Sequence, residues 1–202
     1  AYDKLTHSGI YGIDETTSTV EDLLDIDIHH YVKVNFTTVR KLVDALGGIE
    51  VISEYDFSAG PGYHYNQGSN YLNGDQALAF ARERYSFSSG DNQRVKNQQA
   101  VISGILNKAT SSPAILTQYN SILGALEDNL VISLSKKEMS ALVKMQLEDM
   151  RGWEIETISL TGSGSYAETY SMPGMELYVM EPNQASIDAA KAAIAGVMGG
   201  AE

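Results

Sequence analysis

Three of the chain's five arginines fall within one short stretch, residues 73–99 (NGDQALAFARERYSFSSGDNQRVKNQQ). Arg82 and Arg84 close one predicted helix, and Arg94 lies near the start of the next, with a loop of Ser, Gly and aromatic residues between them. Guanidinium groups suit phosphate because their planar N–H donors form paired, charge-assisted hydrogen bonds. In a chain of net charge -12, this local positive charge predicts an anion held between two helices.

The first of these helices carries a clear start signal. Asn73 and Gln76 have the spacing of a capping box, in which each side chain bonds a backbone N–H near the helix start. Cations near a helix C-terminus are also favoured by the helix dipole, so Arg82 and Arg84 by themselves are compatible with ordinary surface positions. The second helix is therefore needed to decide between the two interpretations.

Asp91 is predicted to cap that second helix. Arg94 and Gln98 are one helical turn apart and share a face with Val101 and Ile105. A charged side chain on an inward stripe is costly unless it has partners. We therefore expect Arg94 to meet either an anion in a cleft or an internal carboxylate such as Asp91.

The order of predicted helices and strands that position the arginines favours one α/β domain over residues 1–202. The order strand, helix, Gly47-Gly48, strand is typical of a βαβ-like passage and favours a layered fold. Residues 161–171 are predicted to form a loop; they lack the spacing and the lysine of a phosphate-binding P-loop. Strands are predicted at 29–36, 49–53, 153–160 and 177–180, and helices at 14–24, 37–46, 73–84, 91–109, 113–127, 135–150 and 183–198.

Composition excludes several function classes. The absence of cysteine excludes a disulfide framework and a thiolate zinc site, and it leaves the compartment open. A pI near 4.7 weighs against nucleic-acid binding, which depends on Lys and Arg neutralising phosphates. No apolar run is long enough to span a bilayer, and no signal peptide is visible. Because the chain begins at Ala1 without a methionine, we expect it to be a fragment or a processed form.

The motifs in their order resemble a known family. YLNGDQALAFARER followed by DNQRVKNQQ, with KVNFTTVRKLVDALGGIEV and DKLTHSGIYG upstream, resembles the LytR-CpsA-Psr (LCP) family over roughly residues 3–160. The resemblance implies a layered α-β-α sandwich with a mixed central sheet, on the outer face of the membrane or in the cell wall of a Gram-positive bacterium. It implies phosphotransfer of a glycopolymer, such as teichoic acid or capsule, from a polyprenyl-pyrophosphate carrier to peptidoglycan with Mg²⁺.

The resemblance also assigns residues. The family's ARxR arginines match Arg82 and Arg84, and its DxxR pair matches Asp91 and Arg94, which makes these four the catalytic candidates. The residues implied to bind the pyrophosphate are Arg82, Arg84, Arg94, Gln98 and Lys4. Asn97 stands where the family commonly has a second arginine.

Part of the family pattern lies upstream of the DKL motif. The acidic pair that helps hold Mg²⁺ and an arginine in a strand of the form S-(I/V)-P-R-D are not in this chain, so its metal ligands are unknown. We expect the metal ligands and a membrane-anchoring segment outside this chain, and the sequence leaves open whether the N-terminal part of the family domain is truncated or absent. The lipid tail is expected in an apolar slot near Leu78, Phe80, Val101 and Ile105, or else these residues form ordinary core.

Three functions stay open on the sequence. The first is an LCP-type glycopolymer phosphotransferase, and the second is a non-catalytic binder of polyprenyl phosphate or pyrophosphate lipid. The third, less favoured because of the acidic pI, is a transcriptional regulator or attenuator, a label that many family members carry. The sequence names neither the glycopolymer nor the acceptor, and it does not give the oligomeric state.

Overall fold

The computed structural model describes residues 2–88, 90–126 and 130–199. The chain divides into two compact units, one made of residues 1–29 and 156–202 and the other of residues 30–155. The stretch that carries the three arginines lies in the second unit. The single domain predicted for residues 1–202 stays a prediction.

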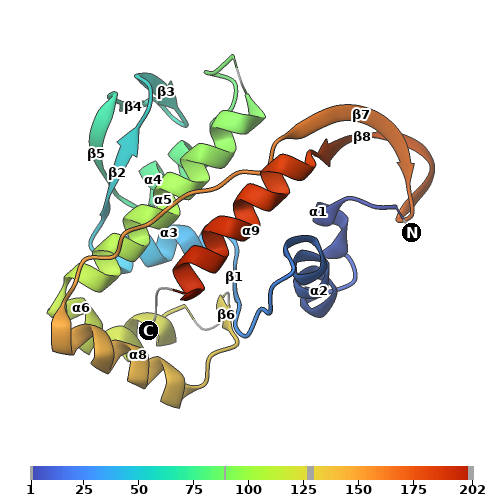
Figure 1. Cartoon of the computed structure of the whole chain (residues 1–202). Helices are drawn as coiled ribbons and strands as arrows, with labels where there is room; N and C mark the ends of the chain where they lie inside the picture. Colours follow the sequence, from blue (N-terminus) through green and yellow to red (C-terminus); the bar gives the residue numbers. More distant parts are fainter. Residues whose placement is uncertain (1, 89, 127–129, 200–202) are drawn as a thin grey trace. The chain divides into compact units, whose positions relative to one another are not determined.

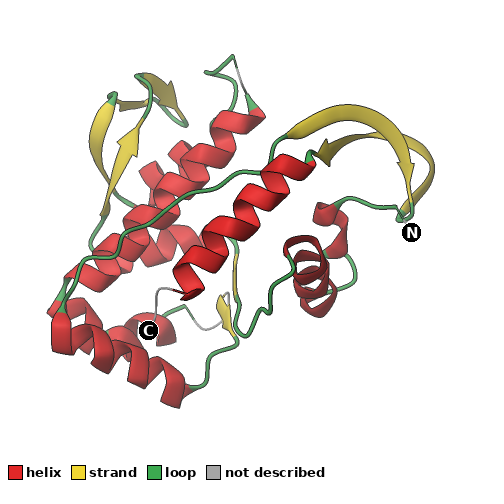
Figure 2. Cartoon of the chain, in the orientation of Figure 1, coloured by secondary structure: helices red, strands yellow, loops and turns green. Residues whose placement is uncertain are grey.

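The second unit combines helices with short strands, drawn in different colours in Figure 2. In chain order its elements are β1 (Val32–Val34), α3 (Phe36–Ala45), β2 (Ile49–Ser53), β3 (Phe57–Ala59), β4 (Tyr63–Tyr65), β5 (Gly68–Leu72), α4 (Gly74–Arg82), α5 (Asp91–Ser111), α6 (Pro113–Thr117), α7 (Tyr119–Gly124), β6 (Leu130–Ile132) and α8 (Lys136–Asp149). The predicted helix at 113–127 is thus two short helices, and Glu127 lies outside the described residues.

The α/β class predicted from the sequence is confirmed, with a different sheet arrangement. Within the described residues, β1 pairs with β6, β2 with β5 and β3 with β4, each pair antiparallel and each a separate two-stranded sheet. The passage β1–α3–β2 is therefore no parallel βαβ crossover, since its two strands belong to different sheets. The mixed central sheet that the resemblance implied is not among the sheets described.

The first unit contains two helices, a long hairpin and a closing helix: α1 (Leu5–Ser8), α2 (Ile13–Leu24), β7 (Gly162–Thr169), β8 (Met172–Pro182) and α9 (Gln184–Gly199). The loop predicted at 161–171 was wrong, because most of it forms β7 and pairs with β8. Pairing with a neighbour rich in β-forming residues overrides the low strand propensity of GSGSYAET. The strand predicted at 153–160 was also wrong, since these residues join no ladder in the described structure.

The core of the second unit forms where α3, α4 and α5 meet the β2–β5 sheet (Figure 1). The alternation in IEVIS buries Ile49 and Val51 on the inward face of β2, as a half-buried strand requires. Tyr65 and Phe80 are fully buried, with ring centroids 5.2 Å apart. Burial raises the pKa of the Tyr65 phenol, whose hydroxyl donates to the Gln76 carbonyl at 2.8 Å.

Two local features fix how α3, α4 and α5 meet this sheet. After α3, Gly47 and Gly48 adopt φ values of 75° and 100°, a left-handed turn that sends the chain into β2. At Gly104, α5 approaches β2 so closely that a Cβ atom would lie 2.5 Å from the Glu50 carbonyl oxygen. Because only glycine permits this approach, Gly104 sets the distance at which α5, and Arg94 on it, lies over the sheet.

Candidate functional site

Arg82 is the last residue of α4, and that helix begins at a capping box as predicted. The Asn73 side chain accepts from the Gln76 N–H, and the Gln76 side chain accepts from the Asn73 N–H, both at 3.0 Å. The Arg82 guanidinium lies 5.3 Å from the centre of the Phe36 ring at the start of α3. Within the described residues it forms no ion pair, so its N–H donors are exposed and available to a ligand.

Arg84 lies just beyond α4 and is held by its neighbour. Its Nη2 donates to the Tyr85 hydroxyl at 2.7 Å, and its guanidinium lies 4.7 Å from the centre of that ring. The hydrogen bond to Tyr85 raises the pKa of Arg84, and the charge of Asp91 adds to the shift. Arg84 is exposed, and a charged guanidinium is therefore presented to solvent beside α5.

Arg94 pairs with Asp91 at 2.6 Å between Nη2 and Oδ1. The prediction that Asp91 caps α5 was wrong: Gly90 occupies the cap position, and Asp91 is the first helical residue. The Asp91 carboxylate forms an ion pair with Arg94 instead. This is the internal carboxylate partner that the sequence offered as the alternative to an anion. The Nε of Arg94 is nevertheless buried without a hydrogen-bond partner in the described structure. Asp91, the partner of Arg94, also acts electrostatically on the exposed Arg84. An unsatisfied buried donor in these surroundings favours an anionic ligand.

The inward face of α5 is rotated from the predicted one. Its buried residues are Gln93, Asn97, Val101 and Gly104. Arg94, Gln98 and Ile105 lie half-buried at the edge of that face. The Gln98 side chain has no hydrogen-bond partner within the described residues, so its role toward a ligand stays a prediction.

A buried amide pair that sequence reasoning missed joins α5 to α4. Gln93 Nε2 donates to Asn97 Oδ1 at 3.1 Å, and Asn97 Nδ2 donates to the Phe80 carbonyl oxygen at 3.2 Å. Phe80 lies in the last turn of α4, where carbonyl groups lack donors from their own helix. Asn97 thus satisfies the end of the helix that carries Arg82. The spacing of Gln93, Asn97 and Val101, each four residues apart, was the available signal.

The loop between Arg84 and Asp91 is held in place by contacts of its described residues. The Glu83 carboxylate accepts from the backbone N–H groups of Tyr85 at 2.7 Å and Ser86 at 2.8 Å. Phe87 packs edge-on against Phe57, with 4.8 Å between ring centroids. These contacts fix Arg84 relative to the core.

Lys4 belongs to the first unit, so its expected contact with the pyrophosphate stays a prediction. Beside it, Asp3, His7 and Ser171 form a cluster that the sequence did not reveal. Asp3 Oδ1 and Ser171 Oγ each lie 2.7 Å from the same ring nitrogen, His7 Nδ1. A proton relay needs one partner on each ring nitrogen, so this cluster ties the N-terminal segment to the β7–β8 turn rather than activating Ser171.

The charge of Asp3 is stabilised within that cluster. Burial raises its pKa, but hydrogen bonds from the Lys4 backbone, Ser171 and His7 outweigh burial and lower the pKa below its usual value. Asp3 is therefore a carboxylate at neutral pH, and its charge contributes to the stability of the first unit.

The described part of the chain contains no complete magnesium site. No three or more of its His, Cys, Asp and Glu residues are placed to bind one ion. Near the arginines, the Asp91 carboxylate is taken up by Arg94. Mg²⁺ needs several oxygen ligands in octahedral geometry. These residues do not fit the ion by themselves.

None of the helices that the structure describes within residues 2–199 has the length and apolar character needed to cross a membrane.

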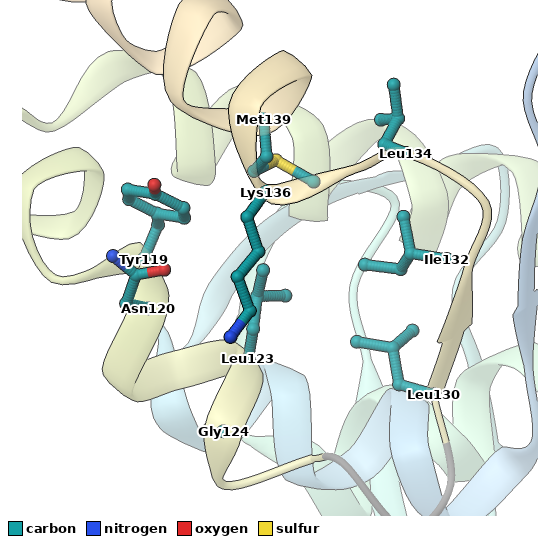
Figure 3. Close-up of a pocket in the computed structure, with 9 residues that line it drawn as sticks. All are labelled: Tyr119, Asn120, Leu123, Gly124, Leu130, Ile132, Leu134, Lys136 and Met139. Carbon is teal, nitrogen blue, oxygen red and sulfur yellow. The ribbon is translucent and has the colours of Figure 1, made fainter.

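A cavity of about 570 Å³ lies between α7, β6 and the start of α8 (Figure 3). Aliphatic side chains dominate its wall, with Lys136 among them; the apolar members are Leu123, Leu130, Ile132, Leu134 and Met139. The slot expected near Phe80 and Val101 is different: these residues are 0% and 2% exposed and belong to the core, which confirms the alternative interpretation for them.

The structure therefore defines an α/β protein with arginines on two joined helices. Arg82 ends α4, and Arg94 lies in the first turn of α5. The sequence model of the LytR_cpsA_psr family matches residues 2–191, and the chain belongs to that family. It is 34% identical over 166 residues to a Bacillus cereus protein named polyisoprenyl-teichoic acid–peptidoglycan teichoic acid transferase TagU, a match that covers 82% of this chain and 54% of the relative. The chain therefore spans about half the length of the curated relatives it matches.

Solved structures agree with this assignment. Bacillus subtilis TagU superimposes with a TM-score of 0.71 at 30% identity, over 95% of this chain and 75% of TagU. A structure of TagT bound to LIIa-WTA gives a TM-score of 0.74 at 26% identity, over 98% of this chain and 73% of TagT.

Proposed function

We propose that the protein transfers a glycopolymer of the teichoic acid kind from a polyprenyl-diphosphate carrier to peptidoglycan. The observation that carries this proposal is the grouping of donors on two joined helices. Arg82 is exposed without an ion pair in the described structure, Arg84 is exposed beside Tyr85, and Arg94 has a buried Nε without a partner. The names of the TagU relatives and the complex of TagT with LIIa-WTA support the choice of substrate.

The chemistry needs charge neutralisation more than a covalent intermediate with the protein. A hydroxyl oxygen of the acceptor bonds to the phosphorus that carries the glycopolymer, and the bond from that phosphorus to the bridging oxygen breaks. Polyprenyl phosphate leaves with the electron pair, and the hydroxyl proton passes to solvent. Arg82 and Arg84 bind the diphosphate and stabilise the charge that builds on the leaving phosphate.

Asp91 acts in this scheme as a positioning residue. Its ion pair with Arg94 sets the direction of that guanidinium, and the Asn97 bond to Phe80 keeps α5 in register with α4. Arg82 on α4 and Arg94 on α5 can therefore bind the same diphosphate only while these two helices stay packed together.

The cavity of about 570 Å³ supports a place for the isoprenoid chain. Burial of apolar carbon contributes roughly 25 cal/mol per Å², and this favours an aliphatic wall for a polyprenyl tail. Mg²⁺ and a location at the outer face of a Gram-positive cell membrane are further parts of the proposal; they rest on the family resemblance, and no step above passes through the metal.

The test is direct binding of farnesyl diphosphate, a short soluble polyprenyl diphosphate, by calorimetry. Losing charge-assisted hydrogen bonds worth about 1.5–3 kcal/mol predicts a drop in affinity of roughly 10- to 100-fold for Arg82→Ala. Arg151→Ala is the matched control, because Arg151 is an exposed arginine whose ion-pair partner is Asp149. Equal affinities for the two variants would remove Arg82 from the site.

Transfer is tested separately with a lipid-linked glycopolymer, peptidoglycan and Mg²⁺. Product that depends on Arg82 supports the transferase. A chain that binds farnesyl diphosphate through Arg82 yet forms no product would instead be a lipid-binding protein, and the enzymatic proposal would fail.

A further inference from the structure

A second cavity of about 590 Å³ lies at the other end of α5 from Arg94. Residues of the β2–β5 sheet, the last turns of α5 and the segment after α8 form its wall; those that matter here are Glu50, Tyr71, Gly104, Asn107, Lys108 and Trp153. Lys108 is fourteen residues beyond Arg94, which is about 21 Å along a helix. This groove is therefore distinct from the arginine site.

Two aromatic rings in the groove are exposed and yet fixed in direction. Tyr71 is 63% exposed, and its hydroxyl donates to the Gly47 carbonyl at 2.8 Å. Trp153 is 49% exposed, and its Nε1 donates to Gln146 Oε1 at 2.8 Å. Gln146 is itself buried and donates to the Thr110 carbonyl at 3.0 Å. Because hydrogen bonds at the ring edges fix the direction of both rings, their exposed parts can meet a ligand at little entropic cost.

The polar groups around these rings are suited to a ligand without strong charge. Within the described residues, the Asn107 side chain has no hydrogen-bond partner, and the Lys108 ammonium lies 5.8 Å from the centre of the Tyr71 ring. Glu50 accepts from the Ser69 hydroxyl and supplies the opposite charge to Lys108. Gly104 lets α5 approach β2 closely, which brings Asn107 and Lys108 to the edge of the sheet that carries Glu50 and Tyr71.

Exposed aromatic faces combined with amide, ammonium and carboxylate groups are the chemistry that recognises carbohydrate. The C–H faces of a sugar ring pack on an aromatic ring, and its hydroxyls bond to polar groups at the ring's rim. An anionic diphosphate, in contrast, would gain little from a groove whose charges balance.

We propose that this groove binds a chain of N-acetylated hexoses, the glycan strand of the peptidoglycan acceptor. The choice of strand rests on the proposed function, whereas the carbohydrate chemistry rests on the groove. A polymer held here would be tethered about 20 Å along α5 from the reacting diphosphate. Such tethering raises the local concentration of acceptor hydroxyls near the arginines.

The probe is the linear tetramer of N-acetylglucosamine, and the signal is tryptophan fluorescence, since Trp153 is the chain's single tryptophan. Titration is expected to change the fluorescence saturably, and Tyr71→Ala is expected to weaken binding at least fivefold. Tyr170→Ala is the matched control, because Tyr170 is 67% exposed and does not line the groove. Asn107→Ala, an exposed change, gives a second weakening should Tyr71→Ala alter the fold.

No saturable change with the folded protein overturns the inference, as does equal affinity for Tyr71→Ala, Asn107→Ala and Tyr170→Ala. Failure here is separable from failure of the proposed function. Tyr71→Ala is expected to bind farnesyl diphosphate normally, and Arg82→Ala is expected to bind the tetramer normally. Loss of tetramer binding in Arg82→Ala would contradict a separate glycan groove.

Discussion

Replacing Asn97 by alanine removes the amide that joins α5 to α4. Asn97 is 3% exposed, so water does not readily replace its hydrogen bonds. The Phe80 carbonyl oxygen and Gln93 Nε2 would each lose a partner. An unsatisfied buried polar group costs about 1–3 kcal/mol, so we expect a loss of about 2–4 kcal/mol in the free energy of unfolding.

The matched control is Asn107→Ala on the same helix. Asn107 is exposed and its side chain has no partner within the described residues. Alanine favours a helix over asparagine by about 0.5 kcal/mol at both positions, so the difference between the variants isolates the buried amide. For a chain of this size, 1 kcal/mol corresponds to about 2–4 °C, which predicts a melting temperature roughly 4–16 °C lower for Asn97→Ala than for the control.

Urea unfolding followed by circular dichroism measures the difference, and calorimetry with farnesyl diphosphate measures its effect on the site. Because Arg82 and Arg94 lie on the two helices that Asn97 joins, we expect Asn97→Ala also to bind the diphosphate more weakly than Asn107→Ala. If the two variants unfold within about 0.5 kcal/mol of each other, the buried amide does not hold the helices together and this reasoning is refuted.

Three further predictions concern the scaffold, the lipid cavity and the first unit. Gly104→Ala is expected to destabilise the protein by about 1–3 kcal/mol in urea unfolding, because a Cβ atom would overlap the Glu50 carbonyl; an unchanged midpoint would contradict the close approach. Ile132→Asp is expected to weaken binding of farnesyl diphosphate while leaving inorganic pyrophosphate binding unchanged, and an equal loss for both ligands would exclude the cavity as the lipid site. Folding lowers the pKa of Asp3, so the Asp3 carboxylate stabilises the folded state at pH values above the ordinary pKa of 3.8. This stabilisation is lost as the pH falls through the pKa of the folded state. Thermal unfolding should therefore show wild type more stable than Asp3→Asn near pH 6, with a gap that shrinks below pH 3.8; a constant gap would refute this account.

The elements that local sequence dictates were predicted well. The capping box at Asn73 forms as predicted, because a cap depends only on residues three positions apart. The strand Ile49–Ser53 was also predicted with its observed bounds, since its alternation and the two preceding glycines are local signals.

Signals that depend on a distant partner misled the prediction. Residues 153–160 alternate like a strand but join no ladder in the described structure, whereas the polar Gly162–Thr169 becomes β7 because β8 pairs with it. A strand is stabilised by its neighbour as much as by its own residues. Likewise, the sequence pattern of α5 does not reveal which face turns inward until α4 and β2 are in place.

The sequence by itself determined the arginines, their spacing and the family, because these depend on residue types in a fixed order. Only the tertiary structure decided what surrounds each of them. It paired Arg94 with Asp91, left Nε of Arg94 without a partner in the described structure, and buried Asn97 against Phe80. The physical reason is that hydrogen-bond satisfaction depends on which groups meet across elements, and residues 17 positions apart, such as Phe80 and Asn97, meet only when two helices pack.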